Sequence, residues 1–313
     1  MGNRIILVSV GIILTVTFAG LSLRFFDFHS LLRAGKLFLG NPLSVAAVFA
    51  AYTGAFLLRA WAHYLYIGRR ASYTVLLQGI GYSLFINHLV PVKVGDAARV
   101  GYIMKKGGLK GDDALHSVAV LRGLDMAVLI FFAGAGLVVF QQGIRFTSFF
   151  LAAGGVAFIL IAAAVLLSVR NGKIKRLAAK QVQLLKEGMR GIKGAAAVSM
   201  IALSWILEAA VIFEIARTGW EGLSFGESVF ANSLTVGGQV FQIAPGGLAT
   251  YESMMTFALA ITGVPASFGY QAAILSHLFK FAFSYLTGFL LLLTAPVAVI
   301  DLKQWTDKRR GNR

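Results

Sequence analysis

The chain has 313 residues, of which 58% are hydrophobic and 13% are charged, and its formal net charge at pH 7 is +16. The apolar residues come in blocks of about twenty, the length of a membrane-spanning helix. Segments 93–110, 170–193 and 303–313, which lie between these blocks, hold 18 of the 29 Lys and Arg residues. This placement is typical of cytoplasmic loops and argues against nucleic-acid binding as the cause of the charge. The absence of cysteine excludes disulfides, thiolate metal sites and cysteine nucleophiles.

Three membrane spans and one interrupted helix are predicted in the first half of the chain, residues 1–143. The spans are expected at Ile5–Leu23, Leu43–Tyr66 and Asp113–Phe140. Between the last two, the apolar segment Tyr73–Val90 is broken at Pro91–Asp96 and resumes over Ala97–Met104. Basic residues flank this segment on both sides, so we expect it to enter and leave the membrane by one face, as a re-entrant helical hairpin. Asp96 is the candidate N-cap of the returning helix.

The second half, residues 144–313, is predicted to follow the same plan. Its spans are expected at Thr147–Val169, Gly194–Ala216 and Gly269–Ile300. Within Gln239–Glu252, the sequence Pro245-Gly246-Gly247 interrupts a hydrophobic run. An unpaired backbone group in hydrocarbon costs several kcal/mol, so such a break survives only where protein covers it or where it lines a wet cavity. The predicted hairpin consists of a helix through Phe230–Gln242, a turn at Ile243–Gly247, and a second helix from Ala249 with Glu252 in its first turn.

The two halves are expected to be antiparallel, because each contains an odd number of crossings. Their hairpins should therefore enter the membrane from opposite faces. In both halves a glycine and then an acid follow the proline of the break, and the acids are Asp96 and Glu252. Inverted repeats with broken helices that meet near the midplane are a frequent transporter plan. The predicted fold is all-α and polytopic, with two inverted-topology halves and both termini in the cytoplasm.

Charged residues inside the predicted spans indicate a cavity or buried partners, because a charge at the centre of a membrane helix costs about 2.5–3.5 kcal/mol on insertion scales. Arg122 and Asp125 lie three residues apart and can pair with each other, either as a structural pair or as part of a ligand site. Glu208 has no basic residue on its own helix. Its partner must come from elsewhere, and Lys280 or Arg122 is expected to serve.

The last span carries one polar and small-residue stripe, formed by His277, Lys280, Ser284 and Gly288 at three- and four-residue spacing. A stripe with this period should face the protein interior. Helix packing through small residues explains Ser284 and Gly288 but leaves Lys280 unexplained. Lys280 is therefore predicted to have a functional or charge-pairing role.

The two hairpin tips combine helix N-termini with glycines, an arrangement suited to a phosphate group. Gly95, Gly246 and Gly247 would let a phosphate approach the backbone, although the same glycines also suit simple turns. Arg99, one turn after the first tip, either faces the same cavity or extends to the cytoplasmic surface. The five histidines show no metal-ligand spacing, so neither a metal nor another cofactor is predicted.

Four motifs and the polar last helix together suggest a family. The motifs are Asn87-His-Leu-Val-Pro-Val-Lys-Val-Gly-Asp-Ala-Ala-Arg99, Val120-Leu-Arg-Gly-Leu-Asp125, Ser204-Trp-Ile-Leu-Glu208 and Ala244-Pro-Gly-Gly-Leu-Ala-Thr-Tyr-Glu252. In order and spacing the chain resembles the lysylphosphatidylglycerol synthase transmembrane family, also called flippase-like membrane proteins. The resemblance extends from about Ile5 to Lys303.

The resemblance implies translocation of a lipid with a polar or phosphate headgroup across the cytoplasmic membrane of a prokaryote. The best-known members flip aminoacylated phosphatidylglycerol and carry a soluble aminoacyl-transferring domain. The present chain ends ten residues after Lys303, so we expect neither that domain nor its reaction. The cargo stays open among phospholipids, polyprenyl phosphates and glycolipids.

Two residues depart from the pattern that the resemblance implies. Leu121 stands before Arg122 where an acid is expected, which leaves the pairing of the arginine to Asp125. Lys280 stands where an arginine is expected, and a lysine binds phosphate without bidentate geometry.

The resulting hypothesis is a lipid translocase without enzymatic activity, whose partners are membrane lipids and not nucleic acid. One alternative is an intramembrane enzyme on lipid phosphates, motivated by Asp96, Glu252 and His88 near the breaks. The other is a non-catalytic membrane partner of a separate lipid-modifying enzyme. The predicted substrate-binding residues are Asp96, Arg99, Arg122, Asp125, Glu208, Pro245, Gly246, Gly247, Tyr251, Glu252 and Lys280.

Overall fold

The computed structural model of the protein describes residues 18–90, 94–140, 191–239 and 244–296, and every regular element in these ranges is a helix. Four helices are long and apolar enough to cross a membrane: Pro42–Tyr66, Gly111–Phe140, Gly191–Arg217 and Ala266–Thr294. They coincide with four of the predicted spans, so the prediction of an all-α, multi-pass membrane protein is confirmed. The predicted span Thr147–Val169 lies outside the described residues, as does most of Ile5–Leu23, of which residues 18–23 are helical.

Two helices begin at side chains that cap them well. Helix α2 (Phe28–Leu39), which was not predicted, begins after Asp27, whose carboxylate accepts a hydrogen bond from the backbone N–H of His29. Helix α3 (Pro42–Tyr66) begins after Asn41 and has proline in its first turn, a position where no intrahelical N–H is lost. These signals are local, which is why the start of α3 follows closely from the sequence.

The first predicted hairpin consists of α4 (Tyr73–Leu89) and α5 (Gly95–Gly107), which pack against each other. The prediction that Asp96 caps α5 is wrong, because Val94 occupies the N-cap position and no side chain caps the helix there. The backbone N–H of Gly95 instead donates to the Asn87 side chain on α4, at 2.9 Å. A side chain from the opposite helix therefore satisfies the donor, which frees the Asp96 carboxylate for other contacts.

The second predicted hairpin consists of α11 (Phe225–Gly238), a 3₁₀ turn at Pro245–Gly247 and α12 (Thr250–Ile261). Gly246 and Gly247 have φ values of 64° and 84°, a region that glycine enters without steric cost. Glu252 lies in the first turn of α12, as predicted. Residues 240–243, which include the end of the predicted helix Phe230–Gln242 and the first residue of the predicted turn, lie outside the described residues.

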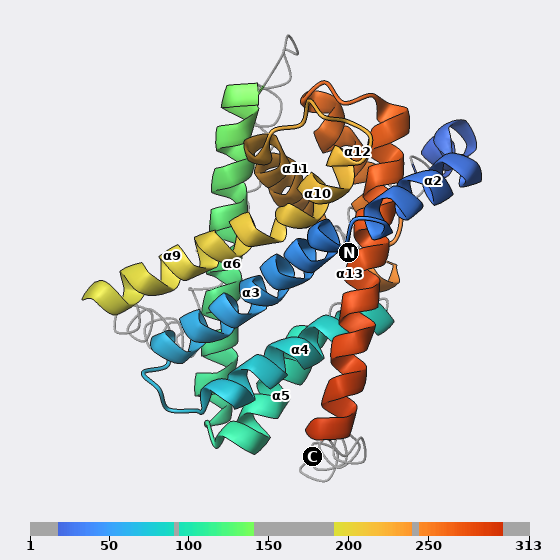
Figure 1. The fold of residues 1–313 in the computed structure, drawn as a ribbon. Coiled ribbons are helices and arrows are strands. Elements are labelled where there is room, and N and C mark those ends of the chain that lie inside the picture. The colour runs from blue at the N-terminus through green and yellow to red at the C-terminus, as the bar shows by residue number, and fades with distance from the viewer. Residues whose placement is uncertain (1–17, 91–93, 141–190, 240–243, 297–313) are drawn as a thin grey trace, which may run out of the picture.

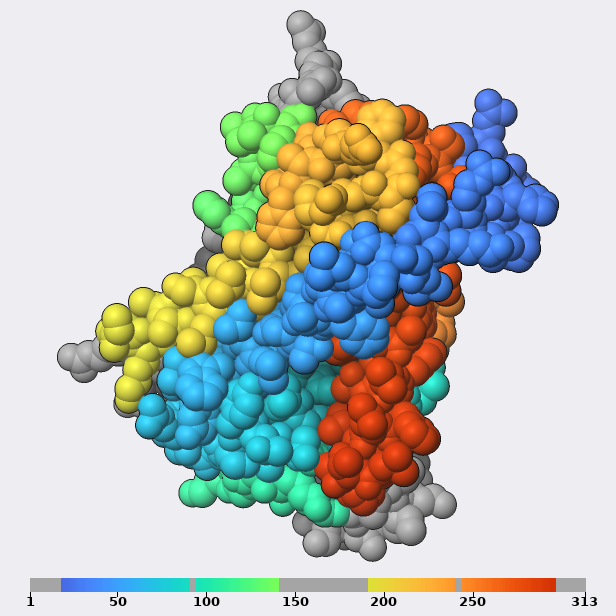
Figure 2. Space-filling model, in the orientation of Figure 1, coloured from blue at the N-terminus to red at the C-terminus, as the bar shows by residue number. Residues whose placement is uncertain are grey.

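The remaining helices hold the two hairpins between them (Figure 1). Helices α6 (Gly111–Phe140) and α13 (Ala266–Thr294) run along the molecule on opposite sides. Helix α9 (Gly191–Glu208), which continues as α10 (Ala210–Arg217), packs along α3. On the face drawn in Figure 2, α3 fills the space between α9 and α4.

Each hairpin packs most closely against a long helix of the other half of the chain. Helix α4 contacts α13, and α11 contacts α6. At both contacts a glycine makes room for a phenylalanine ring, with Gly288 against Phe85 in the first and Gly136 against Phe230 in the second. These glycines let the helices approach until little space is left between them.

Candidate functional site

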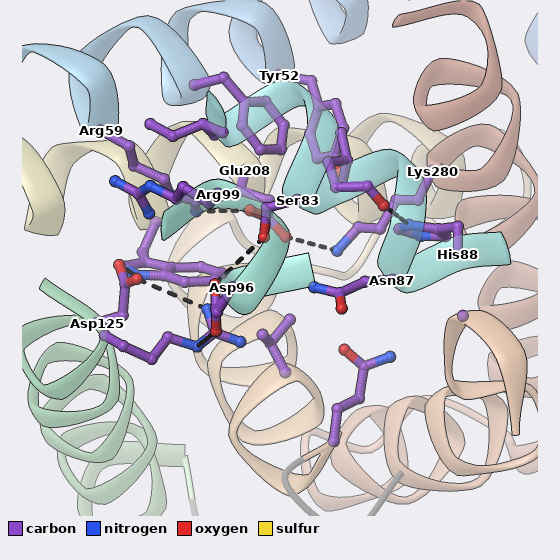
Figure 3. A pocket seen from close by; sticks show the side chains of 18 of the residues that line it. Tyr52, Arg59, Ser83, Asn87, His88, Asp96, Arg99, Asp125, Glu208 and Lys280 are labelled. Atoms are coloured by element: carbon purple, nitrogen blue, oxygen red, sulfur yellow. Dashed lines mark hydrogen bonds and ion pairs between the residues drawn. The ribbon is translucent and has the colours of Figure 1, made fainter. Parts of the chain in front are cut away.

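A polar cavity of about 140 Å³ lies between the two hairpins, several times the space that one water needs. Side chains from α3, α4, α5, α6, α9, α11, α12 and α13 contribute to its wall (Figure 3). The cavity brings together the following predicted site residues: Asp96, Arg99, Arg122, Asp125, Glu208, Gly246, Tyr251 and Lys280. The three other predicted residues, Pro245, Gly247 and Glu252, do not line it.

Glu208 is held between two cations from different helices (Figure 3). Its Oε1 accepts from Lys280 Nζ at 2.8 Å, and its Oε2 accepts from an Arg59 guanidinium nitrogen at 2.6 Å. Lys280 was one of the two expected partners, and that prediction is confirmed. Arg122, the other expected partner, contacts different acids, and Arg59 was not expected.

Aromatic rings and further hydrogen bonds compensate this buried triad for its loss of water. The Glu208 side chain is only 5% exposed and that of Lys280 only 6%. The guanidinium carbon of Arg59 lies 3.8 Å from the centroid of the Trp205 ring, and Lys280 Nζ also donates to the Asn232 side chain at 3.0 Å. Buried charges need such contacts because burial removes the stabilisation that water provides.

Arg122 of α6 forms two long ion pairs, one within its own helix and one that reaches the first hairpin. Its side chain lies 3.6 Å from the carboxylate of Asp96 and 3.7 Å from that of Asp125. The predicted contact between Arg122 and Asp125 is therefore present, with Asp96 added by the tertiary structure. Each acid has a shorter hydrogen bond elsewhere, Asp96 from Ser83 at 3.2 Å and Asp125 from Trp205 at 3.0 Å. Arg122 is thus the loosest member of the network and keeps 37% of its side chain exposed.

Arg99 faces the cavity, and it forms no ion pair with any carboxylate in the part of the chain that the structure describes. Its Nη2 lies 2.7 Å from Nδ1 of His63, and its Nε has no hydrogen-bond partner. Since a guanidinium only donates, His63 Nδ1 must accept, so His63 is neutral and carries its proton on Nε2. That Nε2–H donates to the hydroxyl of Ser117 at 3.0 Å.

The charge of the cavity follows from its described lining. Arg59, Arg99, Arg122 and Lys280 supply four positive charges, and Asp96, Asp125 and Glu208 supply three negative charges. With the histidines counted as neutral, the sum is +1. Arg99 is the cation that the carboxylates leave uncompensated.

The backbone at both hairpin tips is engaged within the protein. The N–H of Gly247 donates to the Ala244 carbonyl at 3.0 Å, in addition to the contact between Gly95 and Asn87. A Cβ on Gly95 would overlap the Ser83 carbonyl, and one on Gly246 would overlap the Phe281 ring. Both glycines therefore allow close approach of neighbouring chain, and Gly246 also contributes to the cavity wall.

The family model described as Lysylphosphatidylglycerol synthase TM region matches residues 6–288. The chain belongs to this family. The match extends from before the first described residue to beyond Lys280, so every residue that lines the charged cavity lies inside it. The name describes a membrane region rather than a catalytic domain, and it is consistent with a lipid-related membrane function. Neither the curated proteins nor the solved structures contain a match.

The sequence analysis did not predict that α3 contributes to the wall of the charged cavity. Tyr52, Phe56, Arg59 and His63 follow one another at four- and three-residue spacing, so they lie on one helix face. The first three line the cavity, and His63 holds Arg99 behind it. The signal was available, because Arg59 is a charged residue inside the predicted span Leu43–Tyr66.

The described residues contain no group of three or more His, Asp or Glu side chains placed to hold a metal ion. The carboxylates of the cavity are instead occupied by Arg59, Arg122 and Lys280. What this arrangement can do chemically is recognise an anion through the guanidinium groups that line it.

Proposed function

We propose that this protein translocates lipids with a phosphate-containing headgroup across the cytoplasmic membrane. The observation that carries the proposal is the Arg99 guanidinium, which lines a cavity between two helical hairpins and has no carboxylate partner among the described residues. Membership of a family defined by the membrane region of a lipid synthase supports a lipid as the cargo.

The headgroup phosphate would bind Arg99 and Arg122. Arg99 lines the cavity and has a buried Nε without a hydrogen-bond partner, and on turning toward a phosphate its guanidinium would donate to it in a bidentate way. The ion pairs of Arg122 with Asp96 and Asp125 are long, at 3.6 and 3.7 Å. Arg122 can therefore turn toward a phosphate and lose little electrostatic stabilisation. Lys280 stays with Glu208 and contributes positive potential rather than a direct contact. Asp96 and Asp125 would receive a cationic portion of a headgroup.

Movement of the two hairpins would open the path of the headgroup to each side of the membrane in turn. In this proposal residues 1–143 and 144–313 form inverted halves, and the two hairpins reach the cavity from opposite faces of the membrane. Pro245, Gly246 and Gly247 shape the tip that closes the second side, and Tyr251 forms the adjoining wall. Alternating movement of the two tips would expose the cavity to one leaflet at a time, while the acyl chains stay in the bilayer.

Reconstitution tests the proposal. The purified chain is placed in vesicles that contain fluorescently labelled phosphatidylglycerol, polyprenyl phosphate or phosphatidylcholine, and the label in the outer leaflet is quenched over time. We expect faster transbilayer movement of at least one phosphate-bearing lipid than in protein-free vesicles. The variant Arg99→Gln should lower that rate at least tenfold, whereas Arg33→Gln, a change at an exposed position of α2, should leave it unchanged.

Two other outcomes would replace the proposal. A lipid whose mass changes during incubation would indicate the intramembrane enzyme. Movement of no lipid by the chain alone, together with stoichiometric copurification of a lipid-modifying enzyme, would indicate a non-catalytic membrane partner.

A further inference from the structure

A second cavity, of about 380 Å³, lies beside Leu248, the residue that follows the Pro245–Gly247 turn. Apolar side chains from α13 and from residues 18–26 form most of its wall. Glu252 also lines it, although the side chain is only 5% exposed. The buried carboxylate of Glu252 thus lines the apolar cavity, and His277 lines both cavities.

His277 connects Glu252 to the tip of the second hairpin. Its Nδ1 lies 2.6 Å from Glu252 Oε1, and its Nε2 lies 3.0 Å from the carbonyl oxygen of Gly246. A carbonyl oxygen only accepts, so Nε2 must carry a hydrogen. The shorter contact also requires a hydrogen, either on Nδ1 or on Oε1, because two lone pairs would otherwise face each other. The pair thus holds two protons and has a net charge of zero.

Loss of the proton between Nδ1 and Oε1 would break this contact. The product is a carboxylate that faces the lone pair of a neutral imidazole, with a net charge of −1 in a buried site. The other oxygen of Glu252, Oε2, has no hydrogen-bond partner in the described parts of the chain. A buried anion without donors is costly, so the two side chains should separate and Glu252 should move toward water.

None of the other ionisable groups near the pair is placed to take over the contact that the lost proton made between Glu252 and His277. Tyr251 of α12 stacks on the His277 ring at a centroid distance of 4.2 Å. Tyr270 of α13 lines the second cavity beside Glu252, and His88 of α4 approaches His277 through the Phe281 ring between them. Lys280, one turn after His277, is bound to Glu208 of α9. No cation in the described structure forms an ion pair with Glu252 apart from His277 itself.

We propose that Glu252 and His277 form a proton-binding site whose occupancy couples proton movement to lipid movement. One proton enters when the carboxylate and imidazole meet, the same proton leaves when they separate, and no other bond forms or breaks. The proton site stands on the contacts of this pair, whereas the coupling rests on the proposed function.

Gly246 connects the proton site to the charged cavity. Its carbonyl accepts from His277, and the residue lines the charged cavity. When Glu252 moves away, the His277 ring loses the contact at Nδ1 that fixes its orientation, so its Nε2 no longer holds the Gly246 carbonyl in place and this wall of the proposed lipid site can move. The closed hairpin holds one proton more than the open one, so low pH favours the closed form and rising pH favours the open form.

Hydrogen–deuterium exchange of the full chain in nanodiscs tests the proton site without any lipid transport. After correction for the intrinsic effect of pH, peptides that cover 250–261 should lose protection in the wild type as pH rises. In Glu252→Gln the amide donates to Nδ1 of a neutral His277 and does not titrate, so protection should become independent of pH. Glu214→Gln, a change on α10 away from both cavities, should behave as the wild type. Wild-type protection that does not depend on pH, or a pH dependence that survives in Glu252→Gln, would overturn the site.

Vesicles with a pH difference across the membrane test the coupling. Wild-type lipid movement should change several-fold when the gradient is imposed and should return to its starting rate with a protonophore. Movement by Glu252→Gln should be the same in all three conditions. Equal wild-type rates with and without the gradient would refute coupling. Movement of no lipid under any condition would refute the proposed function, and the exchange experiment would still decide the proton site.

Discussion

The two hairpins are built alike but are held by different chemistry. In the first, the Asn87 side chain holds the tip at Gly95. Asp96 forms a long ion pair with Arg122 of α6, and Arg99 lines the cavity. The second is fixed by the Glu252–His277 pair, which is neutral as a whole and bound to the backbone of Gly246. The two proposals divide the roles accordingly: the first hairpin would supply positive charge for a ligand, and the second would respond to protons.

The largest expected effect comes from the Arg59–Glu208–Lys280 triad, whose members lie on α3, α9 and α13, outside both hairpins. Glu208→Gln leaves Arg59 and Lys280 buried without a carboxylate. Removal of one partner of a buried ion pair costs about 3–5 kcal/mol, so thermal unfolding in detergent should begin at a clearly lower temperature. Glu214→Gln is the control, because that carboxylate lies outside the triad. In the double variant Glu208→Gln/Lys280→Met the loss should be smaller than the sum of the two single losses. Additive losses would contradict the coupling between the residues.

Replacement of the tip glycines by alanine tests whether the two hairpin tips are packed equally closely. Gly95→Ala places a methyl group against the Ser83 carbonyl, and Gly246→Ala places one against Phe281 at a positive φ. Each change should destabilise by about 1–3 kcal/mol, measured by thermal unfolding. The matched controls are Gly101→Ala on α5 and Gly237→Ala on α11, where nothing lies within 4 Å of an added methyl group. These controls should be neutral or slightly stabilising.

The division of roles itself predicts two separable defects. Arg99→Gln should weaken binding of a phosphate-bearing lipid roughly tenfold, because a charge-assisted contact is lost. The same variant should keep the pH dependence of exchange over 250–261. Glu252→Gln should show the reverse pattern, with binding at low pH retained and the pH dependence lost. Lipid titration monitored by native mass spectrometry measures the first quantity. A variant that loses both properties would show that the hairpins act as one unit.

The smallest expected effect distinguishes two buried serines, one on each hairpin. Ser83→Ala removes a single hydrogen bond to Asp96 and should cost about 1 kcal/mol in thermal unfolding. Ser233→Ala removes a hydroxyl that has no partner in the described chain, so it should be neutral or stabilising. Equal losses at the two positions would mean that the Ser83 contact contributes nothing of its own.

The sequence alone predicted the four long helices of the described structure, both breaks, and every charged residue of the cavity wall except Arg59. Blocks of apolar residues gave the spans α3, α6 and α13 within a few residues, because span length and capping are local properties. The cost of an unpaired buried charge also predicted that Glu208 needs Lys280 or Arg122, and the first of these is its partner. These inferences require only neighbouring residues or the general cost of burial.

Tertiary structure decided which helix faces which, and therefore which partner each charge obtains. Arg59 reaches Glu208, Asn87 caps Gly95, and His277 meets Glu252, all across contacts between separate helices. Helical periodicity places a side chain on a face but does not state which helix lies opposite that face. That choice depends on the close approach of helices at small residues such as Gly136 and Gly288, a property of the packed molecule as a whole.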